Sequence, residues 1–99
     1  MTDLNHEKVV RLRIDGQVTR TGFRGWAQAQ AEARGLDGWV RDRDGGWIEV
    51  LLAGSAGQVD DMVAACGEGP KAARVSAVTE ADVDPDAPIW AGFHHLPSK

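Results

Sequence analysis

The sequence has few of the features that would place it in several large protein classes. It contains one cysteine, Cys66, in 99 residues, which excludes an intramolecular disulfide and fits a reducing compartment, so we expect the cytoplasm. The first residues are polar, and the sequence contains no apolar run typical of a signal peptide or membrane span, so we expect no membrane association. The 11 basic and 15 acidic residues give a net charge of −4, which argues against a nucleic-acid partner.

The chain also lacks internal repeats, low-complexity segments and linkers, which predicts a single domain. Its length is sufficient for one modest hydrophobic core without disulfides or metals. Hydrophobic residues make up 42% and charged residues 26% of the chain, as in ordinary globular proteins. We expect the polar residues 1–7 to be disordered and residues 8–97 to form the domain, as a monomer.

The charged residues are unevenly distributed along the chain. Most of the basic residues lie in the first half, whereas Glu80, Asp82, Asp84 and Asp86 lie close together near the end. A locally positive surface on a globally acidic protein suits a small anionic ligand better than a polyanion. The early arginines are Arg11, Arg13, Arg20, Arg24, Arg34, Arg41 and Arg43.

The pattern of apolar residues predicts alternating strands and helices. Val10, Leu12 and Ile14 alternate with charged residues, which indicates a strand with one buried face. Between Phe23 and Arg34 the alanines fall on every second residue and would permit a strand, but the Ala, Gln, Glu and Arg content favours a helix that ends at Gly35. Strands are also predicted at residues 36–43, 47–53 and 75–83, with a short last one near Phe93.

Two local signals complete this assignment. Asp44-Gly45-Gly46 predicts a hairpin between the second and third strands. Ser55 and Gln58 have the spacing of a capping box, and a second helix would follow and end at Gly67, Gly69 and Pro70. Its apolar face would comprise Val59, Met62, Val63 and Cys66.

The resulting order is β-α-β-β-α-β with a short terminal strand. This order predicts an α+β, ferredoxin-like sandwich, in which an antiparallel sheet carries both helices on one face. The first strand-helix-strand unit must then be a right-handed crossover.

The loop from Asp15 to Arg24 connects the first predicted strand to the first helix. Such a loop leaves the first N–H groups of the helix without partners at the positive end of its dipole, where phosphate can bind. Arg24, on the first helical turn, can add a permanently charged guanidinium to the same anion. The pattern alone also leaves open a plain connecting loop with surface arginines.

Several blocks of the sequence resemble the acylphosphatases, small ferredoxin-like enzymes that hydrolyse the carboxyl-phosphate anhydride of acyl phosphates. The blocks follow the family's order and spacing over most of the chain, which is more specific than any one of them. They are Gly16-Gln17-Val18, Gly22-Phe23-Arg24, Gly35-Leu36-Asp37-Gly38-Trp39-Val40-Arg41, Asp44-Gly45-Gly46-Trp47-Ile48-Glu49-Val50, Gly69-Pro70-Lys71-Ala72-Ala73-Arg74-Val75 and Gly92-Phe93.

The resemblance implies a catalytic site with no metal and no organic cofactor. The substrate would be a small acyl phosphate and one product inorganic phosphate. An asparagine after the Gly-Trp-Val-Arg block would orient the attacking water. The phosphoryl oxygens would be held by the Arg24 guanidinium and by loop amides, which stabilise charge as it develops; these are the amides of Val18, Thr19, Arg20, Thr21, Gly22 and Phe23.

This chain departs from the family pattern at the asparagine position, which is Asp42. An ionised carboxylate only accepts hydrogen bonds, whereas an amide also donates. At about 4 Å and an effective dielectric constant near 20, two like unit charges repel by roughly 4 kcal/mol, which would weaken phosphate binding. Asp42 can also pair with Arg24 and fill the anion site from within. A general-base role for Asp42 is disfavoured, because the family performs the step without one.

The loop departs from the pattern as well, since Thr19-Arg20-Thr21 stands where the family usually carries Gln-Gly-Val. If the glycine position requires a positive φ, Arg20 costs on the order of 1 kcal/mol in strain. The backbone amides survive all three changes, and Arg20 can bring a second cation to the mouth of the site.

Two hypotheses about function follow. The first is an acylphosphatase with reduced or acid-shifted activity, in which catalysis depends on Arg24 and Asp42 and rises when Asp42 is protonated. The second is a catalytically inactive domain that keeps the fold and binds an anion or a protein partner.

Other residues have simpler explanations. Asp82, Asp84 and Asp86 resemble the start of a calcium loop, but the later positions do not fit, which favours a solvated acidic turn. His94 and His95 are adjacent and would point to opposite faces of a strand, so we expect strand-end residues rather than metal ligands. Cys66 should be a buried small hydrophobe.

The tryptophans should serve packing. The alternative is that two of them, Trp26 and Trp90, line the mouth of the site.

Overall fold

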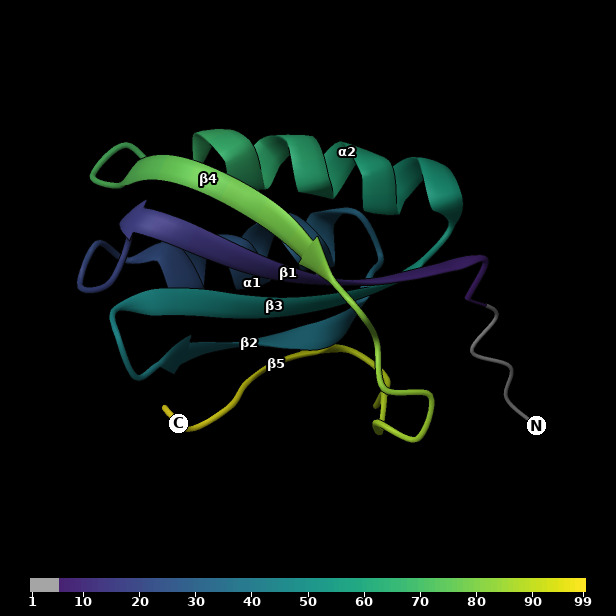
Figure 1. Ribbon diagram of the computed structural model, residues 1–99. Helices are drawn as coiled ribbons and strands as arrows, with labels where there is room; N and C mark the ends of the chain where they lie inside the picture. Colours follow the sequence, from purple (N-terminus) through teal and green to yellow (C-terminus); the bar gives the residue numbers. More distant parts are fainter. Residues whose placement is uncertain (1–5) are drawn as a thin grey trace.

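The computed structural model describes residues 6–99, which form five strands and two helices in the predicted order (Figure 1). Each boundary lies within a few residues of its predicted position. The first strand is longer than its apolar alternation indicates, because its pairing with a neighbouring strand continues through Gly16 and Gln17. The elements are β1 (Lys8–Gln17), α1 (Phe23–Ala33), β2 (Asp37–Arg43), β3 (Trp47–Gly54), α2 (Ala56–Glu68), β4 (Arg74–Ala81) and β5 (Phe93–His95).

The strands form one sheet in the order β4-β1-β3-β2-β5. Strand β3 lies between β1 and β2, so the first strand-helix-strand unit is split, as the ferredoxin-like arrangement requires. Both helices cover the same face of this sheet (Figure 1). The fold class is therefore the one predicted.

The prediction of a purely antiparallel sheet is wrong in one respect. Strand β5 pairs in parallel with β2, in the register Gly38 to Phe93 and Val40 to His95. The sheet is therefore mixed. The physical reason is the long connection after β4, which carries the chain from one edge of the sheet to the other and returns it in the direction of β2.

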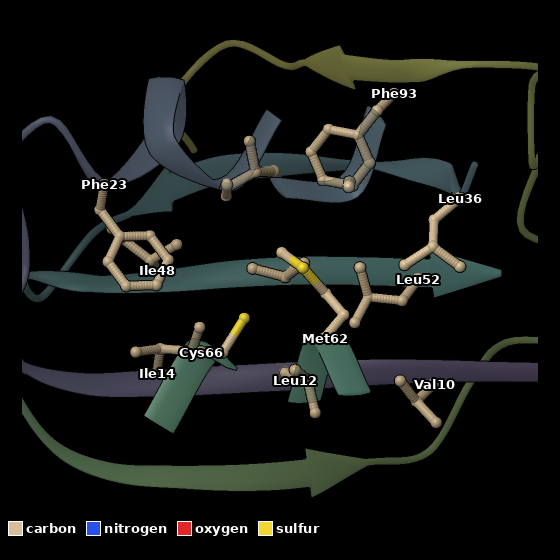
Figure 2. Packing of buried hydrophobic residues seen from close by; sticks show 14 of the residues in the cluster. Val10, Leu12, Ile14, Phe23, Leu36, Ile48, Leu52, Met62, Cys66 and Phe93 are labelled. Carbon is tan, nitrogen blue, oxygen red and sulfur yellow. The ribbon is translucent and has the colours of Figure 1, made fainter. Parts of the chain in front are cut away.

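The hydrophobic core lies between the helices and the sheet (Figure 2). In α1, Ala27 and Ala31 are buried whereas Ala29 and Ala33 are exposed, so the alanines follow helical spacing despite their alternation in sequence. Phe23 is buried at the start of the same helix. The first strand contributes the predicted alternating residues Val10, Leu12 and Ile14. The neighbouring strands add Val40, Ile48, Val50 and Leu52.

The second helix begins and packs as its sequence predicts. The Ser55 hydroxyl accepts a hydrogen bond from the Gln58 N–H at 3.4 Å, and Gly69 caps the other end with a φ of 69°. Val59, Met62 and Cys66 are fully buried on one face, and Val63 is partly buried against the core. The capping residues and the apolar stripe therefore agree on the position of α2.

The expected disorder of residues 1–7 concerns residues 1–5, which lie outside the described part of the chain, and two residues inside it. His6 Nε2 lies 2.8 Å from Asp37 Oδ2. Glu7 Oε1 accepts a hydrogen bond from the Ala56 N–H at 3.0 Å. Both residues just before β1 thus contact the folded domain.

Candidate active site

A cavity of about 160 Å³ opens where the β1–α1 loop meets the ends of the central strands. It draws residues from the loop, from the first turn of α1, and from β2, β3 and β5. These segments are far apart in the sequence. The lining residues are Val18, Arg20, Gly22, Phe23, Arg24, Gly25, Asp42, Ile48 and His95.

The loop keeps its shape through its backbone conformation and two buried anchors. Val18 and Phe23, on either side of the loop, are each 1% exposed. Between them Arg20 adopts a φ of 62° and Gly22 a φ of 81°. The Thr21 hydroxyl donates a hydrogen bond to the Val18 carbonyl oxygen. Arg20 therefore occupies the left-handed region that the family pattern assigns to a glycine, and it carries the strain that the sequence predicts.

The first turn of α1 presents backbone N–H groups at this cavity. Gly22 is the residue that caps the helix, and it provides no side-chain hydrogen bond. The Trp26 N–H makes the first helical hydrogen bond, to the Gly22 carbonyl at 3.0 Å. The amides that precede Trp26, including those of the cavity residues Phe23, Arg24 and Gly25, are therefore not used by the helix itself and lie at its positive end.

Arg24 and Asp42 face each other across the cavity. Arg24 Nε lies 3.6 Å from Asp42 Oδ2, and the two side chains are 44% and 23% exposed. This distance is too long for a hydrogen bond, so the contact is an ion pair through space. Ion pairs with this much solvent access contribute about 0–1 kcal/mol. A small anion that also accepts hydrogen bonds from the backbone N–H groups can therefore compete with the carboxylate for the guanidinium.

The structure brings together most of the residues that the sequence assigns to the site. Arg24, Asp42, Val18, Arg20, Gly22 and Phe23 all line the cavity. Thr19 and Thr21 belong to the same loop but do not line it. Arg20 does bring a second cation to the mouth.

Three lining residues were not predicted from the sequence. Gly25 and Ile48 belong to elements that were correctly placed, and the helical position of Gly25 next to Arg24 was a usable signal. For His95 the sequence predicts only a strand-end residue. Its position depends on the parallel pairing of β5 with β2, for which the local sequence gives no signal.

A charged cluster on the opposite face of the sheet lies behind the site. Glu49 of β3 is 2% exposed and accepts hydrogen bonds from Arg11, Arg41 and Arg43 at 2.7–2.8 Å. Burial alone would raise the pKa of Glu49, but the hydrogen bonds from these arginines outweigh it and hold the pKa below its usual value. Arg41 and Arg43 flank Asp42 in the sequence, so the cluster fixes the β2 segment that carries it.

Three of the tryptophans serve packing as predicted, whereas Trp90 is 46% exposed. The guanidinium carbons of Arg13 and Arg43 lie 4.4 and 5.0 Å from the centre of the Trp47 ring, and Trp39 is 7% exposed. Trp26 packs against the core beside Phe23. The alternative that Trp26 and Trp90 line the mouth is wrong, because neither borders the cavity.

The remaining candidate residues lie away from the cavity. Cys66 is fully buried, and burial raises the pKa of its thiol to about 12. The Asp86 N–H donates to Asp84 Oδ1 at 2.9 Å, so this acidic segment forms a local turn. Within residues 6–99, no group of three or more potential ligand side chains has a metal-binding arrangement.

Comparison with known proteins gives the family. The acylphosphatase family model matches residues 10–95, which include every residue of the cavity. The chain belongs to the acylphosphatase family. An acylphosphatase from Rhodopseudomonas palustris is 46% identical over 80 residues, which are 81% of this chain and 81% of the relative.

Solved acylphosphatase structures have the same fold. The acylphosphatase from Bacillus subtilis superposes with a TM-score of 0.75 at 31% identity, and covers 89% of this chain and 97% of its own. The acylphosphatase from Coxiella burnetii superposes with a TM-score of 0.80 at 26% identity, and covers 97% of this chain and all of its own. The chain therefore shares the α+β, ferredoxin-like fold of the acylphosphatase structures. None of its described helices is long and apolar enough to cross a membrane.

Proposed function

We propose that this acylphosphatase-family chain hydrolyses acyl phosphates to a carboxylate and inorganic phosphate. The observation that carries the proposal is the cavity itself, where the Arg24 guanidinium and the free amides of the α1 N-terminus converge. Donors fixed in this way stabilise the charge that develops on the phosphoryl oxygens during transfer. The proposed reaction needs neither a metal ion nor an organic cofactor.

The Arg24–Asp42 pair sets the level of activity in this proposal. A phosphoryl group that binds Arg24 must displace the Asp42 carboxylate or accept its negative charge nearby. Because the pair is solvent-accessible, the attraction to be overcome is about 1 kcal/mol or less. Repulsion between Asp42 and the bound dianion is the larger cost. Activity is therefore reduced at neutral pH rather than abolished.

Protonation of Asp42 removes this cost. A protonated carboxyl is neutral and can donate a hydrogen bond, as the amide of an asparagine does. It would then orient the attacking water in the way that the family pattern implies. We expect activity to rise as the pH falls toward 5.

The experiment compares the wild type with Asp42→Asn, using hydrolysis of an aryl-acyl phosphate at about pH 5 and about pH 7.5. Asp42→Asn should raise kcat/KM at the higher pH by about tenfold or more, since removing the charge is worth more than 1.4 kcal/mol. Arg24→Ala should lose activity at both pH values. A flat wild-type profile, unchanged by Asp42→Asn, would contradict the role of Asp42.

The Arg24–Asp42 ion pair also favours a second candidate function. If the carboxylate holds the guanidinium permanently, the domain would be inactive and would bind an anion or a protein partner. Saturable phosphate binding without turnover, in the wild type and in Asp42→Asn, would support this alternative. Turnover that appears only in Asp42→Asn would show a competent site that one residue switches off.

Several wider expectations belong to the same proposal. We take residues 8–97 as the functional unit, and a monomer as its working state. A reducing compartment, the cytoplasm, is consistent with the free thiol of Cys66. Size-exclusion chromatography with light scattering checks the monomer directly.

A further inference from the structure

His95 occupies a position in the cavity that its sequence context does not reveal. In the parallel β2–β5 pairing, Gly38 lies opposite Phe93 and Val40 lies opposite His95. Phe93 and His95 are two residues apart in the strand, so their side chains point to the same face of the sheet. Phe93 is buried in the core beneath α1. His95 follows two residues later on the same face, at the open end, where it lines the cavity with Arg24 and Asp42.

The preceding histidine lies on the other face. His94 pairs with Trp39, which belongs to the face opposite the helices. Its ring nitrogen Nε2 lies 2.7 Å from the Ala91 carbonyl oxygen, and its ring meets Trp90 edge to face at 6.0 Å. Two adjacent histidines therefore have different surroundings, and only His95 borders the site.

The charged groups that share the cavity with His95 come from three elements. Arg20 comes from the loop, Arg24 from α1 and Asp42 from β2. Lys99, on the segment that follows β5, donates its backbone N–H to the Asp42 carbonyl but does not line the cavity. With neutral His95 the lining charges are two positive and one negative; protonation of His95 adds a third positive charge.

We propose that His95 is a further ligand-binding residue of this site, which donates to the dianionic phosphoryl group and strengthens its binding as the pH falls. A histidine side chain changes its charge between about pH 5 and 8, so it acts in a range where the arginines do not change. In its charged form both ring nitrogens donate. The inference rests on the proposed function for its natural ligand, but binding of an inert anion tests it separately.

The experiment measures sulfate binding by titration calorimetry and by NMR at about pH 5.5 and about pH 7.5. Sulfate keeps both negative charges over this range, so any pH dependence belongs to the protein. The variants are His95→Gln and the matched control His94→Gln. Both are also made in an Asp42→Asn background, which removes the titration of that carboxyl.

In the wild type, the dissociation constant for sulfate should be about three- to tenfold lower at the acid pH, as expected for a solvent-accessible charge acting on a dianion. His95→Gln should reduce this gain and, in the Asp42→Asn background, abolish it, whereas His94→Gln should leave it unchanged in both backgrounds. The His95 contribution should persist in the Asp42→Asn background. Sulfate should also change the NMR signals of the His95 ring and leave those of the His94 ring unchanged.

Three results would overturn the inference: an acid gain that survives His95→Gln in the Asp42→Asn background, an equal loss in His94→Gln, or no saturable sulfate binding in the wild type. The proposed function fails in a different way. Absent turnover together with His95-dependent sulfate binding would remove the hydrolase activity and leave the binding role intact. Turnover together with sulfate binding that does not depend on His95 would leave the hydrolase activity intact and remove the binding role of His95.

Discussion

The β1–α1 loop places an arginine in a backbone conformation that suits glycine. Arg20 has a φ of 62°, and L-residues in this region carry about 1–2 kcal/mol of strain. The same residue lines the cavity and adds a cation to it. Stability and ligand attraction are therefore opposed at this one position.

Replacement of Arg20 separates these two effects. Arg20→Gly should stabilise the fold by about 0.5–1 kcal/mol, because glycine relieves the strain but gains freedom in the unfolded chain. It should also weaken sulfate binding. Arg20→Ala is the control, since it removes the charge and keeps Cβ. Urea denaturation measures the stability of both variants. An equal gain in stability in Arg20→Ala would exclude backbone strain as the cause.

At the same scale, the sequence predicts some of the residues that line the cavity and not others. Arg24 and Asp42 were found because matching blocks on both sides fix their positions. The strain at Arg20 followed from the glycine expected there. His95 was missed because a three-residue strand has no periodicity to read, and its partner is set by the long connection before it.

At the scale of the secondary-structure elements, one glycine allows β2 and β3 to pair closely. Gly38 has a φ of 138°, and a Cβ there would overlap the Leu51 carbonyl oxygen. Gly57 in α2 has no positive φ, and a Cβ there would meet nothing within 4 Å. The two positions therefore respond differently to the same substitution.

Gly38→Ala should destabilise the domain by about 3 kcal/mol or more, because the clash is with backbone and cannot be relieved by a rotamer change. Gly57→Ala should be neutral or stabilising by up to about 1 kcal/mol, since alanine has the higher helix propensity. Thermal unfolding of both variants checks the pair. Equal effects at the two positions would contradict the close approach of β2 to β3.

The buried carboxylate of Glu49 joins three strands from the face opposite the helices. Arg11 comes from β1, and Arg41 and Arg43 come from β2. Glu49→Gln would leave three guanidinium groups without a counter-charge, which should cost about 3 kcal/mol of stability. Glu80→Gln, at an exposed position of β4, is the matched control and should change stability by about 0.5 kcal/mol or less.

The elements themselves were largely predictable. Ser55, Gln58 and Gly69 gave the limits of α2, and the Asp44-Gly45-Gly46 turn gave the β2–β3 hairpin. Residue patterns along one strand do not reveal its neighbours, however. The direction of β5 is therefore known only from the structure. The same is true of the place of His95 in the cavity wall.

For the whole molecule, Glu49 makes stability depend on pH with a definite sign. Its pKa is lower in the folded state than the usual value of 4.5. Its contribution is therefore fully present above that pH and is lost as the pH falls through the lowered value. Urea midpoints of wild type and Glu49→Gln should differ most near neutral pH and converge in acid. A constant difference down to about pH 3 would contradict this linkage.

The burial of Cys66 gives the protein a built-in probe of local unfolding. The chain has one cysteine, it is fully buried beneath α2, and the pKa of its thiol is raised to about 12. A thiol reagent therefore has one target, and the reaction must wait until the helix lifts away from the sheet. The rate of labelling in the absence of denaturant would report how often the native molecule opens, without any engineered probe.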